Sequence, residues 1–337
     1  MAQELRLSSP SRYRLAFRLS PFWLRNGPLV TTVAVFALLY VIGGQLYPAM
    51  MKPQVFANLF INNASLLLVS IGLTFVILTG GIDLSVGGMI ALISTASAAL
   101  LKAGVSPFVV MPLMIVVGVA FGSAMGGLIQ YLRVQPFIVT LMGLFFTRGV
   151  AYLISLTSVT ITDPVYKFLA LTSVPLPFST YVYVPTLVGP LMLVVALLVL
   201  AFTRFGRTLY AIGNNEQSAT LMGLPVARTT ILAYAFSGFC SALAGIVTSI
   251  SLLAGYGQFA NGLELDAIAS VVIGGTLLSG GVGGVVGTLF GVLINGTIVS
   301  ILQFNGTLTS WWTRIGVGAL TLIFIGIQSL FYSRRRS

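Results

Sequence analysis

Long apolar runs, separated by short clusters of charged residues, proline, glycine and asparagine, fill almost the whole of this 337-residue chain. An α-helix rises about 1.5 Å per residue, so roughly 20 apolar residues cross a hydrocarbon core of about 30 Å. The eighth run is short, so it either begins before residue 267 or belongs to a broken helix. The pattern predicts an all-α polytopic transmembrane bundle of about ten spans, at residues 28–47, 58–79, 86–101, 107–130, 136–156, 186–203, 229–254, 267–279, 284–302 and 307–331.

A glycine pattern in the first half of the chain recurs in the second half. Residues 118–130 read GVAFGSAMGGLIQ and residues 283–295 read GGVVGTLFGVLIN, with three glycines in register followed by Leu-Ile and an amide. Glycines four residues apart lie on one helix face and let two backbones approach closely. Helix packing, with direct substrate contact as the alternative, is therefore the expected role of Gly118, Gly122, Gly126, Gly283, Gly287 and Gly291. Two shorter matches flank this one in the same order: 81–85 with 262–266, and 145–148 with 311–314.

The two copies of this repeat are predicted to cross the membrane in opposite directions. The fourth span holds the first copy and runs inward, and the ninth span holds the second copy and runs outward. The repeat halves, about 58–156 and 239–331, would then form an inverted internal repeat. Inverted repeats recur in transporters, where the substrate path lies at the repeat interface near the midplane.

The composition agrees with a membrane protein and gives its spans a direction. Hydrophobic residues make up 57% of the chain and charged residues 7%, against about 25% charged in soluble domains. With the N-terminus inside, twelve arginines fall in inner segments and three lysines in outer segments, as the positive-inside rule predicts. We expect both termini in the cytoplasm, with a basic segment at 1–27, one transmembrane domain at 28–331 and a basic tail at 332–337. The net charge of +11 then serves topology and lipid headgroups rather than nucleic acid.

Several kinds of chemistry are excluded by residues that the chain lacks. No lysine follows a glycine, so the chain has no P-loop for ATP. With no histidine and one cysteine, Cys240, we expect no His/Cys metal site, no Ser-His or Cys-His nucleophile and no intrachain disulfide. The chain is therefore expected to hold no metal or cofactor and to have no enzyme activity.

Three of the six acidic residues lie beside predicted helix starts. Asp83 and Ser85 belong to TGGIDLSVGG, where paired glycines break the helical pattern. A carboxylate at the centre of a membrane costs about 3 kcal/mol, so Asp83 should lie at the inner mouth, pair with an arginine or face water. Glu264 and Asp266 belong to ANGLELDAI on the outer side, where acids complement the dipole of a helix start. Each acid is either a structural cap or ion pair, or part of a gate or mouth of a translocation pathway.

Four amides and one arginine lie within or next to spans. Asn62, Asn63, Gln130 and Asn295 are candidates for lining a translocation pathway, because amides pair well with hydroxyl groups. The alternative for each amide is an interhelical hydrogen bond. Arg148 lies twelve residues into a span and needs a partner, which is either an ion pair or carbonyl within the protein, or a ligand.

The longest inner loop, 204–228, is predicted to contain a short helix outside the membrane. Asn214 can cap this helix, with Gln217 three residues on, while Gly223 and Pro225 end it. A plain connector needs no such element, so the loop favours docking of a cytoplasmic partner, with a mere surface helix as the alternative. The apolar residues that the helix would present are Leu221 and Met222.

The outer loop 157–185 is rich in proline and too polar to span a membrane. It is either a periplasmic docking surface or a linker.

At these motifs the chain resembles a known family. TGGIDLSVGG (79–88), GNNEQSATLMGLP (213–225) and LELDAIASVVIGGTLLSGGVGG (263–284) together are similar to the permease subunits of bacterial ABC importers for monosaccharides, the ribose-type permeases. The resemblance covers nearly the whole chain after residue 27. The run 263–291, together with NGTLTSWWTRI (305–315), looks closest to one of the paired permeases of the galactofuranose importer.

This resemblance implies about ten helices related by an inverted repeat, in a permease that works as a dimer in the bacterial inner membrane. It implies three partners: an ABC ATPase that binds ATP and Mg²⁺, a second permease subunit and a periplasmic sugar-binding protein. The family's coupling loop carries an acidic-Ala-Ala pattern before a glycine. Here it reads Glu216-Gln217-Ser218-Ala219, a degraded pattern that fits one half of a heterodimer. The coupling residues implied are Asn214, Glu216, Ala219, Leu221, Met222, Gly223 and Pro225.

Three other functions remain open from the sequence. An ion-coupled secondary transporter also has inverted repeats, but it usually keeps acidic residues mid-span, whereas Asp83, Glu264 and Asp266 fall at predicted span ends. The second is a branched-chain amino-acid permease of the same broad superfamily, and the third is a membrane scaffold without transport. The permease of an ATP-driven monosaccharide importer is the favoured function.

Overall fold

The computed structural model describes residues 21–306, 311–312, 315–316, 318–319 and 322–323. The predicted tenth span, 307–331, therefore lies largely outside the described residues. The same holds for the basic tail, 332–337, and for residues 1–20 of the basic N-terminal segment.

Helices make up most of the described structure, and the strands are short. In chain order the α-helices are α1 (Pro21–Leu46), α2 (Pro53–Asn62), α3 (Ala64–Leu78), α4 (Val86–Lys102), α5 (Pro107–Leu132), α6 (Pro136–Ile154), α7 (Pro164–Leu171), α8 (Val188–Phe202), α9 (Arg204–Asn214), α10 (Glu216–Leu221), α11 (Val226–Leu252), α12 (Leu263–Ile273) and α13 (Val285–Asn305). Two 3₁₀ helices are η1 (Pro48–Met51) and η2 (Val184–Leu187). Strand β1 (Val159–Thr160) pairs antiparallel with β4 (Ala254–Gly255), and β2 (Ser173–Leu176) with β3 (Thr180–Tyr183).

Six of the described helices are long and apolar enough to cross a membrane: α1, α5, α6, α8 with η2, α11 and α13. Helices α2 and α3 would make a seventh span, but they are bent by 57° around Asn63. Helix α4 has 17 residues and α12 has 11, so two of the predicted spans are shorter helices. The predicted polytopic helical bundle is confirmed, but its helices are not ten uniform spans.

The eighth predicted span, 267–279, has the wrong bounds. Helix α12 begins earlier and ends earlier, and residues 274–284 form a glycine-rich loop. Gly275, Gly280 and Gly281 have φ angles of 92°, 83° and 77°, which suit glycine and end a right-handed helix. Apolar residues within this loop extended the predicted run past the true end of the helix.

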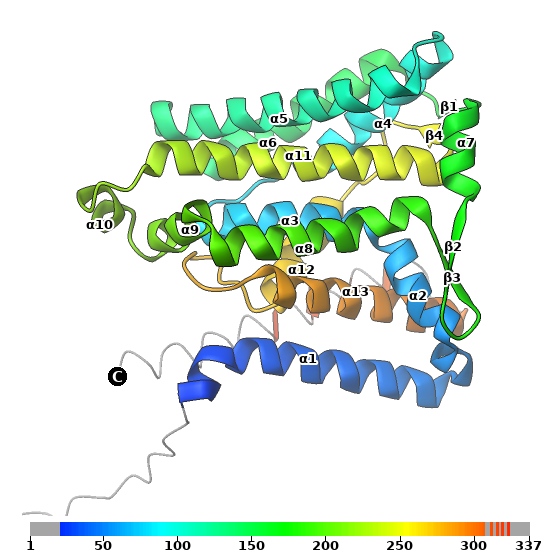
Figure 1. Cartoon of the computed structure of the whole chain (residues 1–337), viewed down its shortest axis with the longest axis horizontal. Coiled ribbons are helices and arrows are strands. Elements are labelled where there is room, and N and C mark those ends of the chain that lie inside the picture. The colour runs from blue at the N-terminus through cyan, green and yellow to red at the C-terminus, as the bar shows by residue number, and fades with distance from the viewer. Residues whose placement is uncertain (1–20, 307–310, 313–314, 317, 320–321, 324–337) are drawn as a thin grey trace, which may run out of the picture.

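The long helices lie side by side, and the two ends of the bundle differ (Figure 1). Helices α9 and α10 lie at one end, called here the α10 end, and α7 with the strands lies at the other, called the strand end. Helix α11 packs against α5, α3 and α4. Helix α3 runs toward the α10 end, where Leu78 O accepts a hydrogen bond from Gly281 N, whereas α11 runs away from α10 toward β4. The two helices are therefore antiparallel.

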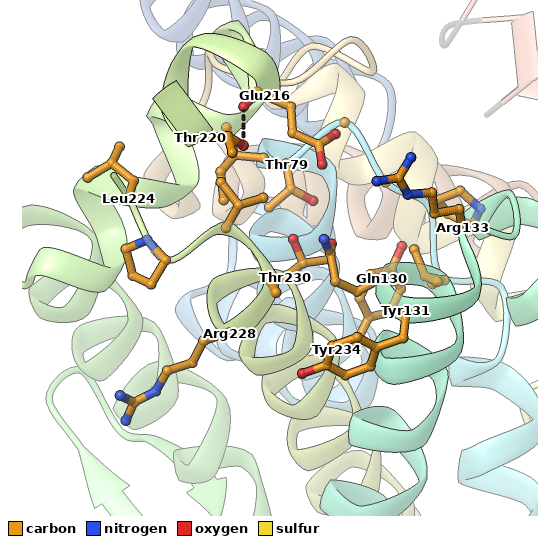
Figure 2. Close-up of a pocket in the computed structure, with 18 of the residues that line it drawn as sticks. Thr79, Gln130, Tyr131, Arg133, Glu216, Thr220, Leu224, Arg228, Thr230 and Tyr234 are labelled. Carbon is orange, nitrogen blue, oxygen red and sulfur yellow. Dashed lines mark hydrogen bonds between the residues drawn. The ribbon is translucent and has the colours of Figure 1, made fainter. Parts of the chain in front are cut away.

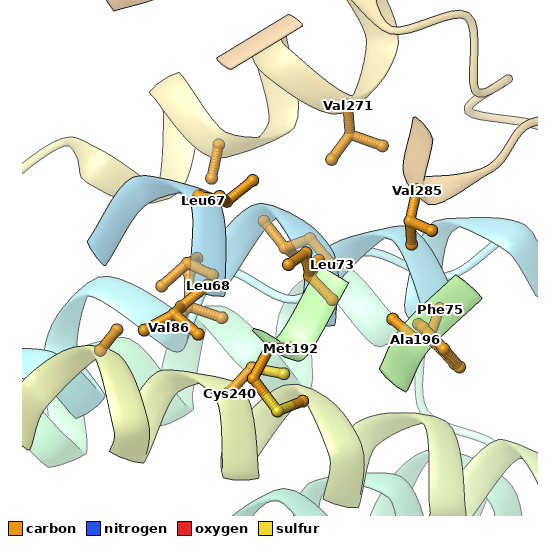
Figure 3. Close-up of a cluster of buried hydrophobic side chains, with 14 of the residues drawn as sticks. Leu67, Leu68, Leu73, Phe75, Val86, Met192, Ala196, Cys240, Val271 and Val285 are labelled. Carbon is orange, nitrogen blue, oxygen red and sulfur yellow. The ribbon is translucent and has the colours of Figure 1, made fainter. Parts of the chain in front are cut away.

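Helix α3 is the centre of the hydrophobic core. All of its residues except Ser65 are buried, as expected for a helix that is apolar all round. Leu68, Leu73 and Phe75 belong to a cluster that Met192 of α8 and Val271 of α12 complete (Figure 3). In contrast, α1, α5, α6 and α8 expose many large apolar side chains, which a membrane accommodates and water does not.

The repeated glycines lie at close helix contacts. On α5, an added Cβ at Gly118 would lie 2.5 Å from Gly238 O of α11, and one at Gly122 would collide with Tyr234 O. On α13, Gly287 and Gly291 face Gly274 and Ser270 in the same way. Gly126 also packs against α11.

Gly283 does not lie on the face of α13 as the repeat predicts. It precedes the helix with a φ of 136°, and an added Cβ there would collide with Thr276. The helix starts two residues later because its N-cap, Gly284, is extended.

Candidate functional site

Helix α10 is a short helix at one end of the bundle, as the sequence predicts, but its cap is one residue later. Asn215 Oδ1 accepts a hydrogen bond from Ser218 N at 2.7 Å, which is the ordinary geometry of a helix N-cap. Asn214 instead ends α9, and its Nδ2 donates to Tyr210 O at 2.8 Å. The two neighbouring asparagines are equally good caps by sequence, and only the extended backbone of Asn215 decides between them.

The surface of α10 presents apolar side chains to its surroundings. Leu221 is 89% exposed and Met222 is 68% exposed. Ala219 points the other way and packs with Ile212 and Val226, so the helix is fixed on α9 and α11. Glu216 is also exposed. Gly223, with a φ of 74°, ends α10, and Pro225 precedes α11.

Helix α9, which the sequence did not predict, ties α10 to the interior. Tyr210 Oη donates to Gly283 O at 2.9 Å, and Asn214 Nδ2 donates to Gly281 O at 3.5 Å. Burial raises the pKa of the Tyr210 hydroxyl further above its ordinary range, so this group is a donor at neutral pH. Gly213 packs directly on Leu78 O at the end of α3. A displacement of α10 would therefore reach both the loop 274–284 and α3.

A cavity of about 1320 Å³ opens at the α10 end, between α5, α10 and α11. Gln130, Thr230 and Tyr234 lie on its wall, and Glu216 and Thr220 of α10 border it (Figure 2). The wall thus carries neutral amide, hydroxyl and phenol groups, together with the charged side chains of Arg133, Arg228 and Glu216. Gln130 is the one predicted pathway amide that lies here.

A second cavity, of about 540 Å³, lies at the strand end between the α2–α3 bend, α7 and α11. Asn62, Ser65 and Thr248 line it. Ser65 Oγ and Thr248 Oγ1 are hydrogen-bonded to each other at 2.8 Å. Asn62 therefore lies at a cavity whose wall is mostly apolar, with Asn62, Ser65 and Thr248 among its polar groups.

One face of α11 carries a line of hydroxyl groups that joins the two cavities, called here the α11 polar stripe. Thr230 and Tyr234 reach the cavity at the α10 end and Thr248 reaches the cavity at the strand end. Ser237 and Ser241 lie between them and are buried. All five share one face because their spacing follows 3.6 residues per turn. The prediction from sequence considered amides and charged residues and therefore missed this stripe. Hydroxyl residues at helical spacing within an apolar span would have predicted it.

Asp83 lies inside the bundle beside this stripe, not at the inner mouth. It is 3% exposed. Its Oδ1 accepts hydrogen bonds from Ser85 N at 2.9 Å and Ser85 Oγ at 2.6 Å, and its Oδ2 accepts one from Ser237 Oγ at 2.7 Å. Residues 79–85 turn back into the protein after α3, and most of them are buried before α4 begins. That turn brings the carboxylate to the middle of α11.

Glu264 is also internal rather than at the outer mouth. It is 7% exposed, and its Oε2 lies directly against Gly87 in the first turn of α4. Arg148 of α6 donates to Gly257 O at 3.1 Å and Ala260 O at 3.5 Å, which holds the segment that leads into α12. The expectation of a carbonyl partner for Arg148 is confirmed.

The starts of α4 and α12 therefore meet within the protein. Asp266 is less buried than Glu264. Asp83 and Glu264 do lie next to helix starts, as predicted, but these starts are buried, so their position no longer argues against ion coupling. In contrast to a carboxylate that is free to bind an ion, Asp83 has both of its oxygens hydrogen-bonded to serines of this chain.

The two remaining amides lie together, away from both cavities. Asn63 stands at the α2–α3 bend, where its Nδ2 donates to Leu59 O at 2.8 Å and packs on Gly296 of α13. Asn295 is 4% exposed, and its Nδ2 has no hydrogen-bond partner among the described residues. The structure therefore separates these two from Asn62 and Gln130.

The outer loop 157–185 is a folded element at the strand end. Asp163 caps α7 by accepting from Val165 N at 2.8 Å and Tyr166 N at 3.1 Å. Tyr166 is fully buried. Strand β1 pairs with β4 directly before the segment that Arg148 holds. A partner that moved this loop would therefore act on the start of α12.

The sequence of the chain matches one family over most of its length. A family model described as "Branched-chain amino acid transport system / permease component" matches residues 55–327. No solved structure matches the chain.

Several curated proteins are similar to the chain over nearly their full length. Inner membrane ABC transporter permease protein YjfF of Escherichia coli (strain K12) is 47% identical over 305 residues, which cover 90% of this chain and 92% of that protein. Fructose import permease protein FruG of Bifidobacterium longum (strain NCC 2705) is 37% identical over 307 residues, 89% of this chain and 90% of that protein. Ribose import permease protein RbsC of Bacillus subtilis (strain 168) is 37% identical over 292 residues, 86% of this chain and 88% of that protein.

Proposed function

This chain belongs to the family described as "Branched-chain amino acid transport system / permease component", and we propose that it carries a monosaccharide inward when a partner ATPase hydrolyses ATP. Its relatives within this family are permeases of sugar ABC importers. The family description mentions amino acids, but the relatives named for a substrate are named for fructose, ribose or allose. Those names favour a sugar over an amino acid. The chain is a transport component of a bacterial inner membrane and not an enzyme.

The observation that supports an ATP-driven mechanism best is the connection between α10 and the interior. Leu221 and Met222 stand exposed at the α10 end, and α9 links them to the loop 274–284 through the hydrogen bond from Tyr210. A partner that binds α10 and moves on ATP binding has a direct route to α12, α13 and the end of α3. The chain has no P-loop, so ATP and Mg²⁺ belong to that partner.

The two cavities suit the passage of a neutral, hydroxyl-rich solute. The cavity at the α10 end offers amide, hydroxyl and phenol groups, which exchange hydrogen bonds readily with a sugar. In our proposal the α10 end faces the cytoplasm with both termini, and the sugar leaves through this cavity. The strand end then faces the periplasm, where the loop 157–185 meets a sugar-binding protein.

We propose galactofuranose or a similar sugar as the substrate and a second, different permease subunit as the partner in the membrane. The resemblance of residues 263–291 and 305–315 to a galactofuranose importer permease supports the sugar. The degraded coupling pattern at Glu216-Gln217-Ser218-Ala219 supports unequal subunits. Thermal-shift screening of the binding protein against pentoses, hexopyranoses and hexofuranoses would identify the sugar.

Copurification tests the coupling part of the proposal. We expect an ABC ATPase to copurify with the intact chain from mild detergent, and to be lost when residues 213–225 are scrambled. A scrambled chain that retains the ATPase would mean that the ATPase binds elsewhere.

A further inference from the structure

Helix α4 begins inside the protein with backbone donors that lack partners. Val86, Gly87 and Gly88, its first three residues, are buried. The N–H groups in the first turn of a helix have no acceptor within that helix. Among the described residues, none supplies an acceptor to these three N–H groups. Buried backbone N–H groups without a partner are rare in folded proteins.

The acid closest in sequence does not satisfy these donors. Asp83 uses its Oδ1 for Ser85 and its Oδ2 for Ser237. Asp83 is therefore occupied in holding the turn against α11, and its carboxylate does not accept from the first N–H groups of α4.

A second, independent group points at the same place. Glu264 of α12 is 7% exposed, and its Oε2 has no hydrogen-bond partner among the described residues. A Cβ added at Gly87 would collide with this oxygen, and it would lie 2.9 Å from Ala260 O. The carboxylate thus reaches the helix start only because residue 87 is glycine.

The surroundings hold Glu264 in this position. Arg148 donates to Gly257 O and Ala260 O just before α12, which fixes the segment that leads to Glu264. Thr147, from the same turn of α6, lies against Gly88. Unused donors on α4 and an unused acceptor on α12 therefore face one small region between the two inverted halves.

A hydroxyl group satisfies both sides at once, because it accepts from an N–H and donates to a carboxylate. We propose that the starts of α4 and α12 form a hydroxyl-binding subsite for the transported sugar, with Glu264 Oε2 as the acceptor and the first N–H groups of α4 as the donors. The inference rests on the proposed function. In the present conformation Oε2 lies on Gly87, so a sugar enters when α12 moves away from α4.

The test uses the complete importer in proteoliposomes, with saturating binding protein for each sugar. ATP-driven uptake of the parent sugar is compared with uptake of its singly deoxygenated analogues, in the wild type and in Glu264→Gln. We expect wild type to transport one analogue at least about tenfold less efficiently than the parent, as for one lost hydrogen bond to a charged group. Glu264→Gln should slow uptake of the parent sugar to the rate of that analogue, so that the preference for the parent sugar over the analogue disappears.

A second pair of variants keeps the test decisive if Glu264→Gln assembles poorly. Gly87→Ala should also remove the preference, because its methyl group occupies the subsite. Gly149→Ala is the matched control, since Gly149 lies on α6 with nothing within 4 Å of an added Cβ, and it should transport like wild type.

The outcomes separate this inference from the proposed function. If wild type takes up sugar and both variants still prefer the parent sugar over the deoxygenated analogue, the subsite alone is overturned. Equal slowing of parent and analogues would assign a structural role to Glu264 and would overturn it too. If wild type showed no ATP-driven sugar uptake, the proposed function would fall and the subsite with it.

Discussion

At the scale of single residues, the internal carboxylates are explained by their partners. Asp83 is kept in an apolar bundle by three hydrogen bonds from two serines, since an unpaired buried charge is costly. The sequence identifies Asp83 and Glu264 as residues that need explanation, because acids are rare in the chain. It does not identify Ser237 as a partner, because the two residues are separated by 154 positions.

Removing this partner should destabilise the protein. Ser237→Ala deletes the hydrogen bond to Asp83 Oδ2, and a buried bond to a charged group contributes about 1.5–3 kcal/mol. We expect a loss of that size in the free energy of unfolding in detergent. Ser123→Ala is the control, because Ser123 Oγ donates only to Val119 O of its own helix. Equal destabilisation by both changes would contradict the role given to Ser237.

At the scale of elements, long apolar helices could be predicted and broken ones could not. The bounds of α5 and α6 differ from the predicted spans by two residues at most, because apolar runs and prolines mark them clearly. The bend at Asn63 and the early start of α12 depend on which segments turn back into the bundle. Packing between helices, such as Gly287 on Gly274, decides which segments turn back. This packing has no counterpart in the local sequence pattern.

Helix α10 could be predicted from the sequence because the residues that determine it are close together in the chain. Its cap, its glycine stop and its exposed apolar residues all lie within residues 215–223. Helix α9 was missed because it has only 11 residues and mixes polar with apolar residues, so it does not resemble a membrane helix. By contrast, the fold places Gln130 and Asn62 at two different cavities, Asn63 at the α2–α3 bend and Asn295 in the interior.

Changing the exposed face of α10 should uncouple the ATPase without unfolding the chain. We expect Leu221→Ser with Met222→Ser to lower ATPase copurification at least about tenfold, since two exposed apolar side chains are typical anchors of an interface. The unfolding temperature should stay the same, because both side chains contact solvent. Gln217→Ala, on the same exposed helix, should bind the ATPase normally. Full binding by the double variant would place the interface elsewhere.

At the scale of the whole molecule, the bundle is arranged around α3 and α11, which pack together and run in opposite directions. Helix α3 is followed by the turn 79–85 and then α4 with 17 residues, and α11 is followed by residues 253–262 and then α12 with 11 residues. The breaks bring Asp83 and Glu264 toward the middle from opposite ends. The α10 end carries exposed apolar residues on α10 and the strand end carries the folded loop 157–185, so the surfaces that we propose for the two partners lie at opposite ends.

The orientation of the bundle can be tested with single cysteines, because the sole native cysteine, Cys240, is buried. Ser218 on α10 and Ser173 on β2 are exposed at opposite ends. A membrane-impermeant maleimide should label Ser218→Cys only in inside-out vesicles and Ser173→Cys only in intact cells. The reverse pattern would place the α10 end in the periplasm and remove the basis for its role in coupling.

The most direct test of the central claim is uptake by the chain reconstituted with its second permease, its ATPase and its sugar-binding protein. We expect sugar to accumulate in proteoliposomes only when ATP is present on the side of α10, and to be unaffected by collapse of ion gradients. Uptake that proceeds without the ATPase and follows an ion gradient would contradict an ATP-driven importer and identify a secondary transporter.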